Sequence, residues 1–324
     1  MIAEILIWLF VVVVVLAALG FTYQLIAEQL DSRVQPGELI SVFGRKMHLL
    51  SMGKQDGPTI ILEAGGSNSS STSRKIQSGM AEFAHVCVYD RAGYGFSDPV
   101  NRSRSFADIT ADLDELLTQA RVAPPYILIG ESMGGLMMRN YSRIHPEKVA
   151  GIMLIDAAEE EHTFTRLNKL KGMQKTAAAA AWLARFGLIR ALLNLAPEKA
   201  GIPVTVSSKR RAEIVAEYSQ KNFFKTAGYE LDAYFSTLQD MRKAGGFGTL
   251  GSTPLVVITH GKPFTGTQAF LEEGWTEAQE RLATLSTNSK LVVAERSGHA
   301  ISLDQPELVI EMVRKMMTEV AERD

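Results

Sequence analysis

The sequence predicts an α/β fold with a mostly parallel, eight-stranded sheet, a helical insertion and an N-terminal transmembrane helix. Three observations predict it. Short apolar runs typical of strands alternate with amphipathic helices, which is characteristic of a parallel sheet covered on both faces. Between Asp156 and Pro254 the strand pattern stops and helical patterns take over. The chain also opens with a long apolar run.

The apolar run covers residues 5–21, which contain only apolar residues and glycine. As a helix this run spans about 25 Å, close to the thickness of a bilayer core. Ala18-Leu19-Gly20 also fits a signal-peptide cleavage site, but no Lys or Arg precedes the run. We therefore predict a single-pass anchor over residues 1–30, with a cleaved signal peptide as the alternative. Flanking basic residues slightly favour a cytoplasmic location for the rest of the chain, and the side of the membrane stays open.

The expected elements follow the anchor in a regular order. Residues 38–43 and 46–52 form an antiparallel hairpin joined at Gly44. Ser105 and Asp108 form a capping pair at the start of the first helix. Further strands are expected at 59–62, 85–89, 126–129, 149–155, 254–259 and 291–294, and helices at 105–121, 133–144, 176–195, 209–225, 230–243, 270–285 and 306–322. The expected domains are an α/β core in two parts, 36–156 and 251–324, and a helical cap at 157–250.

Composition excludes some classes of function. The 324 residues are 46% hydrophobic and 22% charged, which is ordinary for a globular protein, and the net charge is −2. No dense basic block is present, which argues against a nucleic-acid partner. Cys87 is the only cysteine and lies in an apolar run, so we expect a buried free thiol. The oligomeric state stays open.

Gly130-Glu131-Ser132-Met133-Gly134 lies between a strand and a helix, and in that context Gly-x-Ser-x-Gly is typical of a nucleophile elbow. Side chains at Gly130 or Gly134 would clash where the backbone turns, and a small residue at Gly135 lets the helix pack on its strand. Ser132 is therefore the candidate nucleophile, and the alternative is a structural serine in a tight turn.

Over about residues 38–322 the chain resembles the α/β-hydrolase fold family. The resemblance rests on residues 90–98 (DRAGYGFSD), the elbow, the strand ending at Asp156, and residues 297–299 (SGH) followed by 304–308 (DQPEL). A serine, then a carboxylate, then a C-terminal histidine is the order of the family's triad. The resemblance implies hydrolysis at a serine without naming the substrate. Dehalogenase and epoxide-hydrolase relatives use aspartate as nucleophile, so Ser132 argues against those activities.

The resemblance implies that His299 is the general base and Asp156 the acid of the triad. In much of the family the acid follows the strand after the cap, but here that strand ends in THGKP, residues 259–263, without a carboxylate. Asp156, at the end of the strand before the cap, occupies a known alternative position, and Glu159 is the next candidate. Asp90 and Asp98 are expected to hold the turn beside the site. The remaining histidines, His48, His85, His145, His162 and His260, are weaker candidates.

The oxyanion hole needs two backbone N–H donors. Met133, directly after the nucleophile, is expected to supply one. The resemblance places the second in the loop Ala64-Gly65-Gly66, with Gly66 as donor and Ser67 as the alternative. Glu131 adds a negative charge at the elbow, and its effect stays open.

We therefore predict a membrane-anchored serine hydrolase, esterase-like or lipase-like, that cleaves carboxylic esters. Apolar residues of the cap favour hydrophobic acyl or lipid esters, although the same residues fit a cap core equally well: Trp182, Leu183, Phe186, Leu188 and Ile189. Lactones, thioesters and amides use the same machinery. A non-catalytic, receptor-like member of the fold is the alternative from another class. The sequence shows no metal-ligand pattern, so neither metal nor cofactor is expected.

Overall fold

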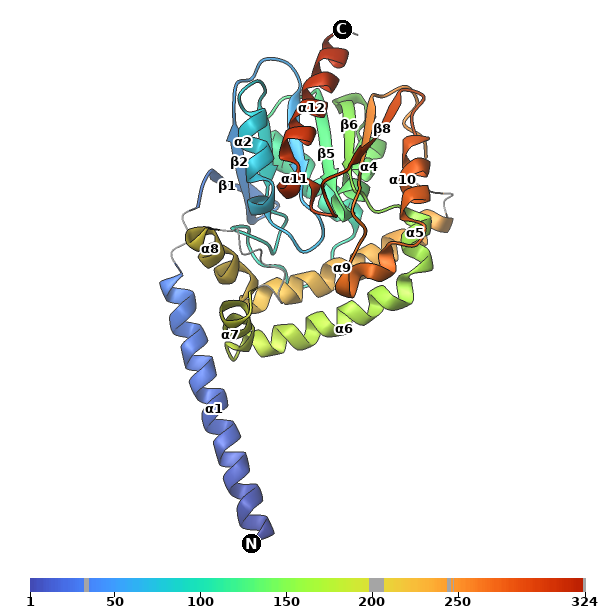
Figure 1. The fold of residues 1–324 in the computed structure, drawn as a ribbon. Helices are drawn as coiled ribbons and strands as arrows, with labels where there is room; N and C mark the ends of the chain where they lie inside the picture. Colours follow the sequence, from blue (N-terminus) through green and yellow to red (C-terminus); the bar gives the residue numbers. More distant parts are fainter. Residues whose placement is uncertain (32–34, 198–206, 244–245, 247, 323–324) are drawn as a thin grey trace. The chain divides into compact units, whose positions relative to one another are not determined.

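The computed structural model describes residues 1–31, 35–197, 207–243, 246 and 248–322. The described residues form an eight-stranded sheet with the order β1-β2-β4-β3-β5-β6-β7-β8 (Figure 1). The predicted fold class is therefore confirmed. The strands are β1 Glu38–Val42, β2 Arg45–Met52, β3 Thr59–Glu63, β4 Val86–Tyr89, β5 Tyr126–Glu131, β6 Val149–Ile155, β7 Leu255–His260 and β8 Ser289–Ala294.

The sheet is mostly parallel. β2 runs antiparallel to both β1 and β4, so the predicted hairpin is confirmed. From β4 to β8 every neighbouring pair is parallel. Parallel strands bring their carboxyl ends to one edge of the sheet, where open α/β sheets form their sites.

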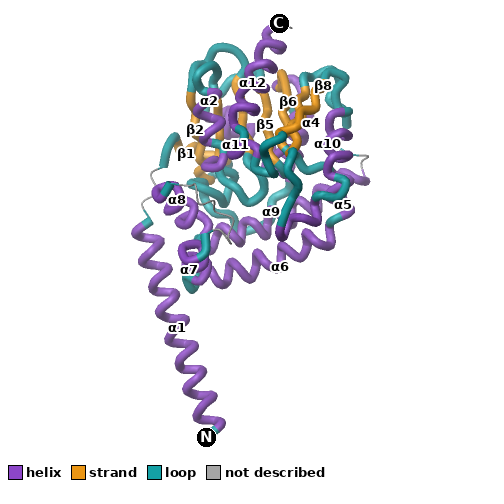
Figure 2. The backbone as a smooth tube through the Cα atoms, in the orientation of Figure 1, coloured by secondary structure: helices purple, strands orange, loops and turns teal. Residues whose placement is uncertain are grey.

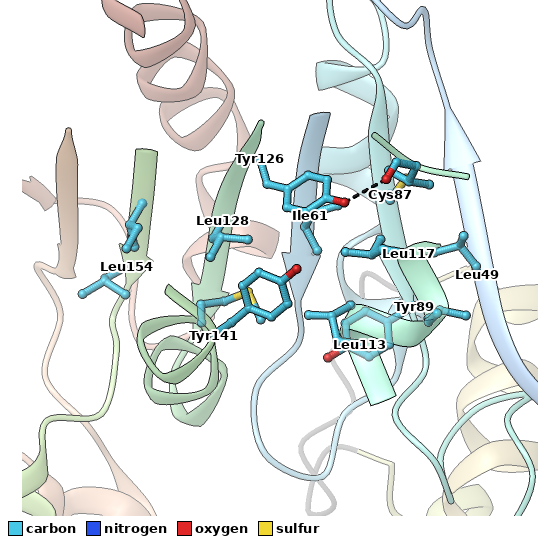
Figure 3. Close-up of a cluster of buried hydrophobic side chains, with 14 of the residues drawn as sticks. Leu49, Ile61, Cys87, Tyr89, Leu113, Leu117, Tyr126, Leu128, Tyr141 and Leu154 are labelled. Carbon is cyan, nitrogen blue, oxygen red and sulfur yellow. Dashed lines mark hydrogen bonds between the residues drawn. The ribbon is translucent and has the colours of Figure 1, made fainter. Parts of the chain in front are cut away.

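Successive residues of the central strands face two separate apolar cores. Ile61, Leu128 and Leu154 point into one core together with side chains of the helices on that face (Figure 3). Ile60, Ile127, Met153 and their neighbours point into the other. Both faces of the central strands are thus buried, which explains why their sequences are continuous apolar runs.

The helices are shown in Figure 2. On the first face lie α3 Phe106–Gln119, α4 Met133–Ile144 and α10 Trp275–Ala283, and on the second α2 Arg74–Met80 and α12 Pro306–Ala321. Ser105 and Asp108 form the predicted capping box of α3. The remaining helices are α1 Ile2–Leu30, α5 Glu160–Thr165, α6 Leu167–Ala184, α7 Leu188–Leu195, α8 Ser208–Tyr218, α9 Lys221–Lys243 and α11 Ile301–Asp304, with 3₁₀ turns η1 Ser70–Thr72, η2 Pro146–Lys148 and η4 Gly266–Leu271.

Four expected helices were wrong in their boundaries. The helix expected at 176–195 is two helices, because Gly187 adopts a left-handed conformation with φ of 70° between α6 and α7. The helices expected at 209–225 and 230–243 are instead α8 and one long α9. The helix expected at 270–285 begins only at Trp275, after the 3₁₀ turn η4.

The chain divides into two compact units. We call residues 1–35 with 171–229 the anchor unit, and residues 36–170 with 230–324 the sheet unit. α1 is the one helix of the described residues that is by itself long and apolar enough to cross a membrane. Cys87 is a buried free thiol in the sheet unit, as predicted.

Candidate active site

Ser132 occupies a strained turn between β5 and α4. Its backbone has φ of 50° and ψ of −121°, a region that residues other than glycine rarely adopt. The Ser132 N–H donates to the carbonyl oxygen of Ile155 at 3.0 Å, and the Ser132 carbonyl accepts from the Ala158 N–H at 3.0 Å. These bonds tie the elbow to both sides of Asp156.

The glycines around Ser132 are needed for close packing. A Cβ at Gly130 would lie 2.5 Å from the Gly134 carbonyl oxygen, and one at Gly134 would lie 2.7 Å from the Ala64 oxygen. A Cβ at Gly135 would lie 2.5 Å from the Ala157 Cβ. A larger residue at any of these positions forces the backbone or a packed neighbour to move.

Asp156 and His299 lie in direct contact. The His299 Nδ1 is 2.6 Å from the Asp156 Oδ2, and the carboxylate is fully buried while the imidazole is 27% exposed. Asp156 directly follows β6 and has φ of 44°. A buried carboxylate on Nδ1 leaves Nε2 of the imidazole free to act on protons, which is the arrangement of a triad base.

Asp156 accepts hydrogen bonds from several other groups. The Nδ1 of His260 lies 2.7 Å from its Oδ2, and the Trp275 Nε1–H donates to its Oδ1 at 2.8 Å. The Oδ1 also accepts from the His260 N–H at 3.1 Å and from the Thr259 hydroxyl at 3.3 Å. We call Asp156, His260, Trp275 and His299 the acid cluster.

These donors determine the charge of Asp156. Burial alone raises the pKa of a carboxyl, but the hydrogen bonds and charges of His260 and His299 outweigh it and lower the pKa of Asp156 to about 2. Burial also disfavours the charged form of His260, which lowers its pKa. The hydrogen bonds and charges of Asp156 and Glu272 outweigh burial, so the pKa of His260 is raised. The Nε2 of His260 lies 3.3 Å from the Glu272 Oε2, a second carboxylate that favours the imidazolium.

The other acidic candidates are engaged elsewhere. Glu159 accepts from the His162 N–H at 2.8 Å and pairs with Arg281 at 2.7 Å. Asp90 accepts from the Ser70 and Phe96 N–H groups, and Asp98 accepts from the Lys46 N–H. Asp90 and Asp98 therefore hold the turn, as predicted.

The loop Ala64-Gly65-Gly66 lies against the elbow. A Cβ on Gly65 would be 3.4 Å from the Ser132 Cβ, and one on Gly66 would be 2.9 Å from the Met133 Cε. The buried Arg91 binds the far side of this loop: its Nη1 donates to the Ala64 carbonyl and its Nη2 to the Gly65 carbonyl, each at 2.9 Å. The backbone of the loop is thus held by a side chain from the segment after β4.

Arg91 is in turn held by two buried carboxylates. Its Nη1 lies 2.5 Å from the Glu63 Oε1, and its Nε lies 2.7 Å from the Glu230 Oε1. The other oxygen of Glu230 accepts from the Ser67 N–H at 2.7 Å and from the Tyr94 hydroxyl at 3.0 Å. We call Glu63, Arg91, Tyr94 and Glu230 the arginine cluster.

Glu131, beside Ser132, is partly buried at the end of β5. Burial, with a smaller contribution from the charge of Asp156, raises the pKa of its carboxyl to about 7. Glu131 therefore titrates near neutral pH.

One group of the described residues has the donors and the spacing to hold a metal ion. The ligand atoms of Asp156, His260 and His299 all lie within 4.8 Å of one another. One carboxylate and two imidazoles fit a transition metal. Each of the three side chains already hydrogen-bonds within the group, so a metal would have to displace those protons.

Sequence reasoning missed three contributors to the site. His260 ranked low as a lone histidine, yet it is the last residue of β7, the parallel neighbour of β6, so adjacent strand ends were an available signal. Arg91 belongs to the motif at residues 90–98, but the sequence predicted no role for its side chain. Glu230 had no signal, because 139 residues separate it from Arg91.

Comparison with known proteins reveals the same fold. A model of the alpha/beta hydrolase fold matches residues 58–306. The uncharacterized protein YqjL of Bacillus subtilis (strain 168) is 23% identical over 270 residues, which cover 83% of this chain and 87% of YqjL.

Solved structures resemble the chain over most of its length. A thermophilic esterase from Thermogutta terrifontis superposes with a TM-score of 0.62 and 17% identity, covering 87% of this chain and 98% of the esterase. The enol-lactonase from Burkholderia xenovorans LB400 gives a TM-score of 0.61 and 18% identity, covering 87% of this chain and all of the lactonase, at 100%. At these identities the likeness shows the fold alone.

Proposed function

The chain belongs to the alpha/beta hydrolase fold family, and from that premise we propose that it is a serine hydrolase that cleaves carboxylic esters through an acyl-enzyme. The observation that carries the proposal is the 2.6 Å contact between His299 Nδ1 and the buried Asp156 carboxylate. The strained Ser132 supports it, because backbone strain at a polar residue is typical of functional sites.

In the proposed reaction the Ser132 Oγ attacks the ester carbonyl carbon as the His299 Nε2 takes its proton. The C=O double bond opens to an oxyanion, which then collapses and expels the alcohol, protonated by His299. A water molecule attacks the acyl-enzyme by the same steps and releases the carboxylic acid. Asp156 stays ionised and stabilises the imidazolium, in accordance with its low pKa.

Met133 and Gly66 are the proposed oxyanion donors. In a trans peptide the C=O and N–H groups point in opposite directions. Arg91 binds the carbonyl of Gly65, so the N–H of Gly66, in the same peptide, points away from Arg91. The Ser67 N–H is bound by Glu230, which argues against Ser67 as the donor.

Hydrophobic acyl or lipid esters are the substrates we propose, with residues 157–250 as a cap. Exposed apolar side chains at Trp182 and Leu188 support this class. Lactones remain a second candidate, because one structural neighbour is an enol-lactonase. Hydrolysis rates over a series of acyl chain lengths test the preference: we expect rates to rise with chain length, and rates that stay flat or fall would argue against lipid esters.

We further propose that α1 is a retained membrane anchor. Its C-terminal end is built into the anchor unit: Gln24 is 3% exposed and donates to the Ser219 carbonyl at 3.0 Å. Arg190 pairs with both carboxylate oxygens of Asp31, just after α1, at 2.8 and 2.7 Å. Cleavage after Gly20 would cut the continuous helix α1 and separate residues 1–20 from Gln24 and Asp31, which attach the helix to the anchor unit. Mass spectrometry of the membrane-extracted protein checks this, since an intact N-terminus is expected.

Labelling with a serine-reactive fluorophosphonate tests the catalytic proposal. The wild-type protein should be labelled at Ser132, and Ser132→Ala should not be labelled although it melts at the same temperature. A folded wild type that takes no label would favour the non-catalytic, receptor-like alternative. Equal labelling of Ser132→Ala would place the reactive serine elsewhere.

A further inference from the structure

The anchor unit exposes large apolar side chains outside α1. Trp182 at the end of α6 is 59% exposed, and on α7 Leu188, Leu192 and Leu195 are 53%, 50% and 86% exposed. They fall within one short stretch of chain, residues 182–195. Clustered exposed apolar side chains mark an interaction surface, whereas single ones need no explanation.

The helix α7 is apolar on two sides. Ile189 and Leu193 pack against residues of α8. Leu188, Leu192 and Leu195, spaced at i, i+4 and i+7, form a second stripe that is exposed. α7 therefore has one apolar side that packs on protein and one that faces outward.

Close contacts join the start of α7 to the C-terminal part of α1, and the two helices are labelled in Figure 1. A Cβ at Gly20 would lie 2.5 Å from the Phe186 carbonyl oxygen, and one at Gly187 would lie 2.8 Å from the Tyr23 ring. The ion pair of Arg190 with Asp31 adds a second attachment. Gly20 lies at the end of the apolar run 5–21, so α7 meets α1 where a spanning helix would leave the hydrocarbon core.

We propose that the exposed face of residues 182–195 is seated in the interface of a lipid bilayer, beside the point where α1 leaves it. The inference rests on the proposed anchoring of α1. Trp182 and the exposed Arg185 are residue types that prefer the boundary between acyl chains and headgroups. The axes of α6 and α7 differ by 98°, so this pair does not form one straight span.

The seated face gives the anchor unit a second attachment to the membrane. An amphipathic helix in this position lies with its apolar side about 5–10 Å into the headgroup region. It also brings residues 182–195 into contact with lipids, the proposed source of substrate.

Tryptophan fluorescence tests the proposal, because the chain contains only Trp8, Trp182 and Trp275. Trp8→Phe removes the reporter on α1, and Trp275 is 3% exposed in the sheet unit. The full-length variant is reconstituted into phosphatidylcholine vesicles with brominated or ordinary acyl chains, and only protein that floats with vesicles is measured. Brominated lipid should quench the emission, and the quenching should vanish in Trp8→Phe/Trp182→Phe.

Each other outcome overturns the inference in a recognisable way. If acrylamide quenches the Trp182 emission and brominated lipid does not, the exposed face of residues 182–195 lies in water. Protection from both quenchers would mean a face covered by protein, such as a second copy. Protein that fails to float would overturn the anchor itself. A variant with Leu188, Leu192 and Leu195 changed to Ser should keep its melting temperature and lose the quenching, whereas the exposed Leu291→Ser of the sheet unit should keep both.

Discussion

The acid cluster and the arginine cluster adjoin the same elbow and are built in opposite ways. In the acid cluster one buried carboxylate, Asp156, accepts hydrogen bonds from two imidazoles and an indole. In the arginine cluster one buried guanidinium, Arg91, donates to two carboxylates and two backbone carbonyls. The central group is an anion, Asp156, in the acid cluster and a cation, Arg91, in the arginine cluster.

The two clusters consequently act on different parts of the proposed reaction. Asp156 contacts His299, so the acid cluster controls proton transfer. Arg91 and Glu230 contact the loop 64–67, so the arginine cluster controls the direction of a backbone N–H. Substitutions in the acid cluster should change reactivity with every ester and with fluorophosphonate. Substitutions in the arginine cluster should lower kcat with little effect on KM, because the oxyanion forms only after Ser132 attacks the carbonyl carbon.

The largest expected effect belongs to Asp156→Asn. The amide keeps the shape of the side chain but cannot hold His299 in the Nδ1–H form or stabilise its charge. We expect kcat to fall by about 10³- to 10⁴-fold. Steady-state hydrolysis of a short-chain ester measures the loss, and a thermal melt checks the fold. Glu159→Gln, at the alternative acid, should keep its activity. Near-normal turnover in Asp156→Asn with loss in Glu159→Gln would reverse the assignment.

Glu230→Gln should have the next largest effect. Arg91 and the Ser67 N–H donate to different oxygens of the Glu230 carboxylate, and Gln replaces one of these oxygens with an NH2 group that cannot accept, so the loop loses part of its support. Removing an oxyanion donor costs about 10²- to 10³-fold, and loosening one should lower kcat by about 10-fold. KM should change little.

Glu159→Gln is the matched control for Glu230→Gln. Both glutamates are 7% exposed, pair with an arginine and accept a backbone N–H. The Arg281 side chain is 47% exposed and that of Arg91 is 4% exposed, so Glu159→Gln should lose less stability than Glu230→Gln, and only Glu230→Gln should lose kcat. An equal loss of kcat in the two variants would mean that Glu230 acts through stability alone.

The sheet could be predicted from sequence because its strands are short apolar runs bounded by turns, and burial on both faces requires that composition. The break at Gly187 was missed, because alanine- and leucine-rich sequence on either side favours a helix and only the left-handed backbone of the glycine ends it. The sequence did not separate α8 from α9 correctly for a similar reason: both are amphipathic, and the turn between Tyr218 and Lys221 is short.

The two clusters also differ in how far the sequence predicts them. The contact of Asp156 with His299 could be anticipated, because the order of the motifs and the edge of a parallel sheet bring strand ends together. The partnership of Arg91 with Glu230 could not, because Glu230 lies in the middle of a helix whose local pattern says nothing about a guanidinium elsewhere. Buried ion pairs between distant segments leave no periodic signal.

His260 sharpens the comparison within the acid cluster. Its raised pKa means that the fold favours the imidazolium. This contribution to stability is complete below the unfolded pKa of about 6.5 and is lost as the pH rises through the folded value. The melting temperature of the wild type should therefore exceed that of His260→Asn by more at about pH 5.5 than at about pH 9. Because the Asn amide can still donate to Asp156, the variant should lose only a few-fold in kcat. An equal difference in melting temperature at both pH values would contradict the imidazolium.

The smallest expected effect belongs to Glu131, whose charge neither cluster neutralises. Its folded pKa of about 7 exceeds the ordinary value of 4.5, because burial and the charge of Asp156 disfavour the carboxylate. Stability associated with the neutral form is complete below about pH 4.5 and is lost as the pH rises through about 7. Glu131→Gln stays neutral, so its melting temperature relative to wild type should rise between about pH 5 and pH 8.5. We expect a gain of about 1 kcal/mol, or roughly 2–4 °C, because partial exposure screens the charge. A gain already present at pH 5 would instead point to packing, and the charge of Glu131 would then have no part in the stability of the elbow.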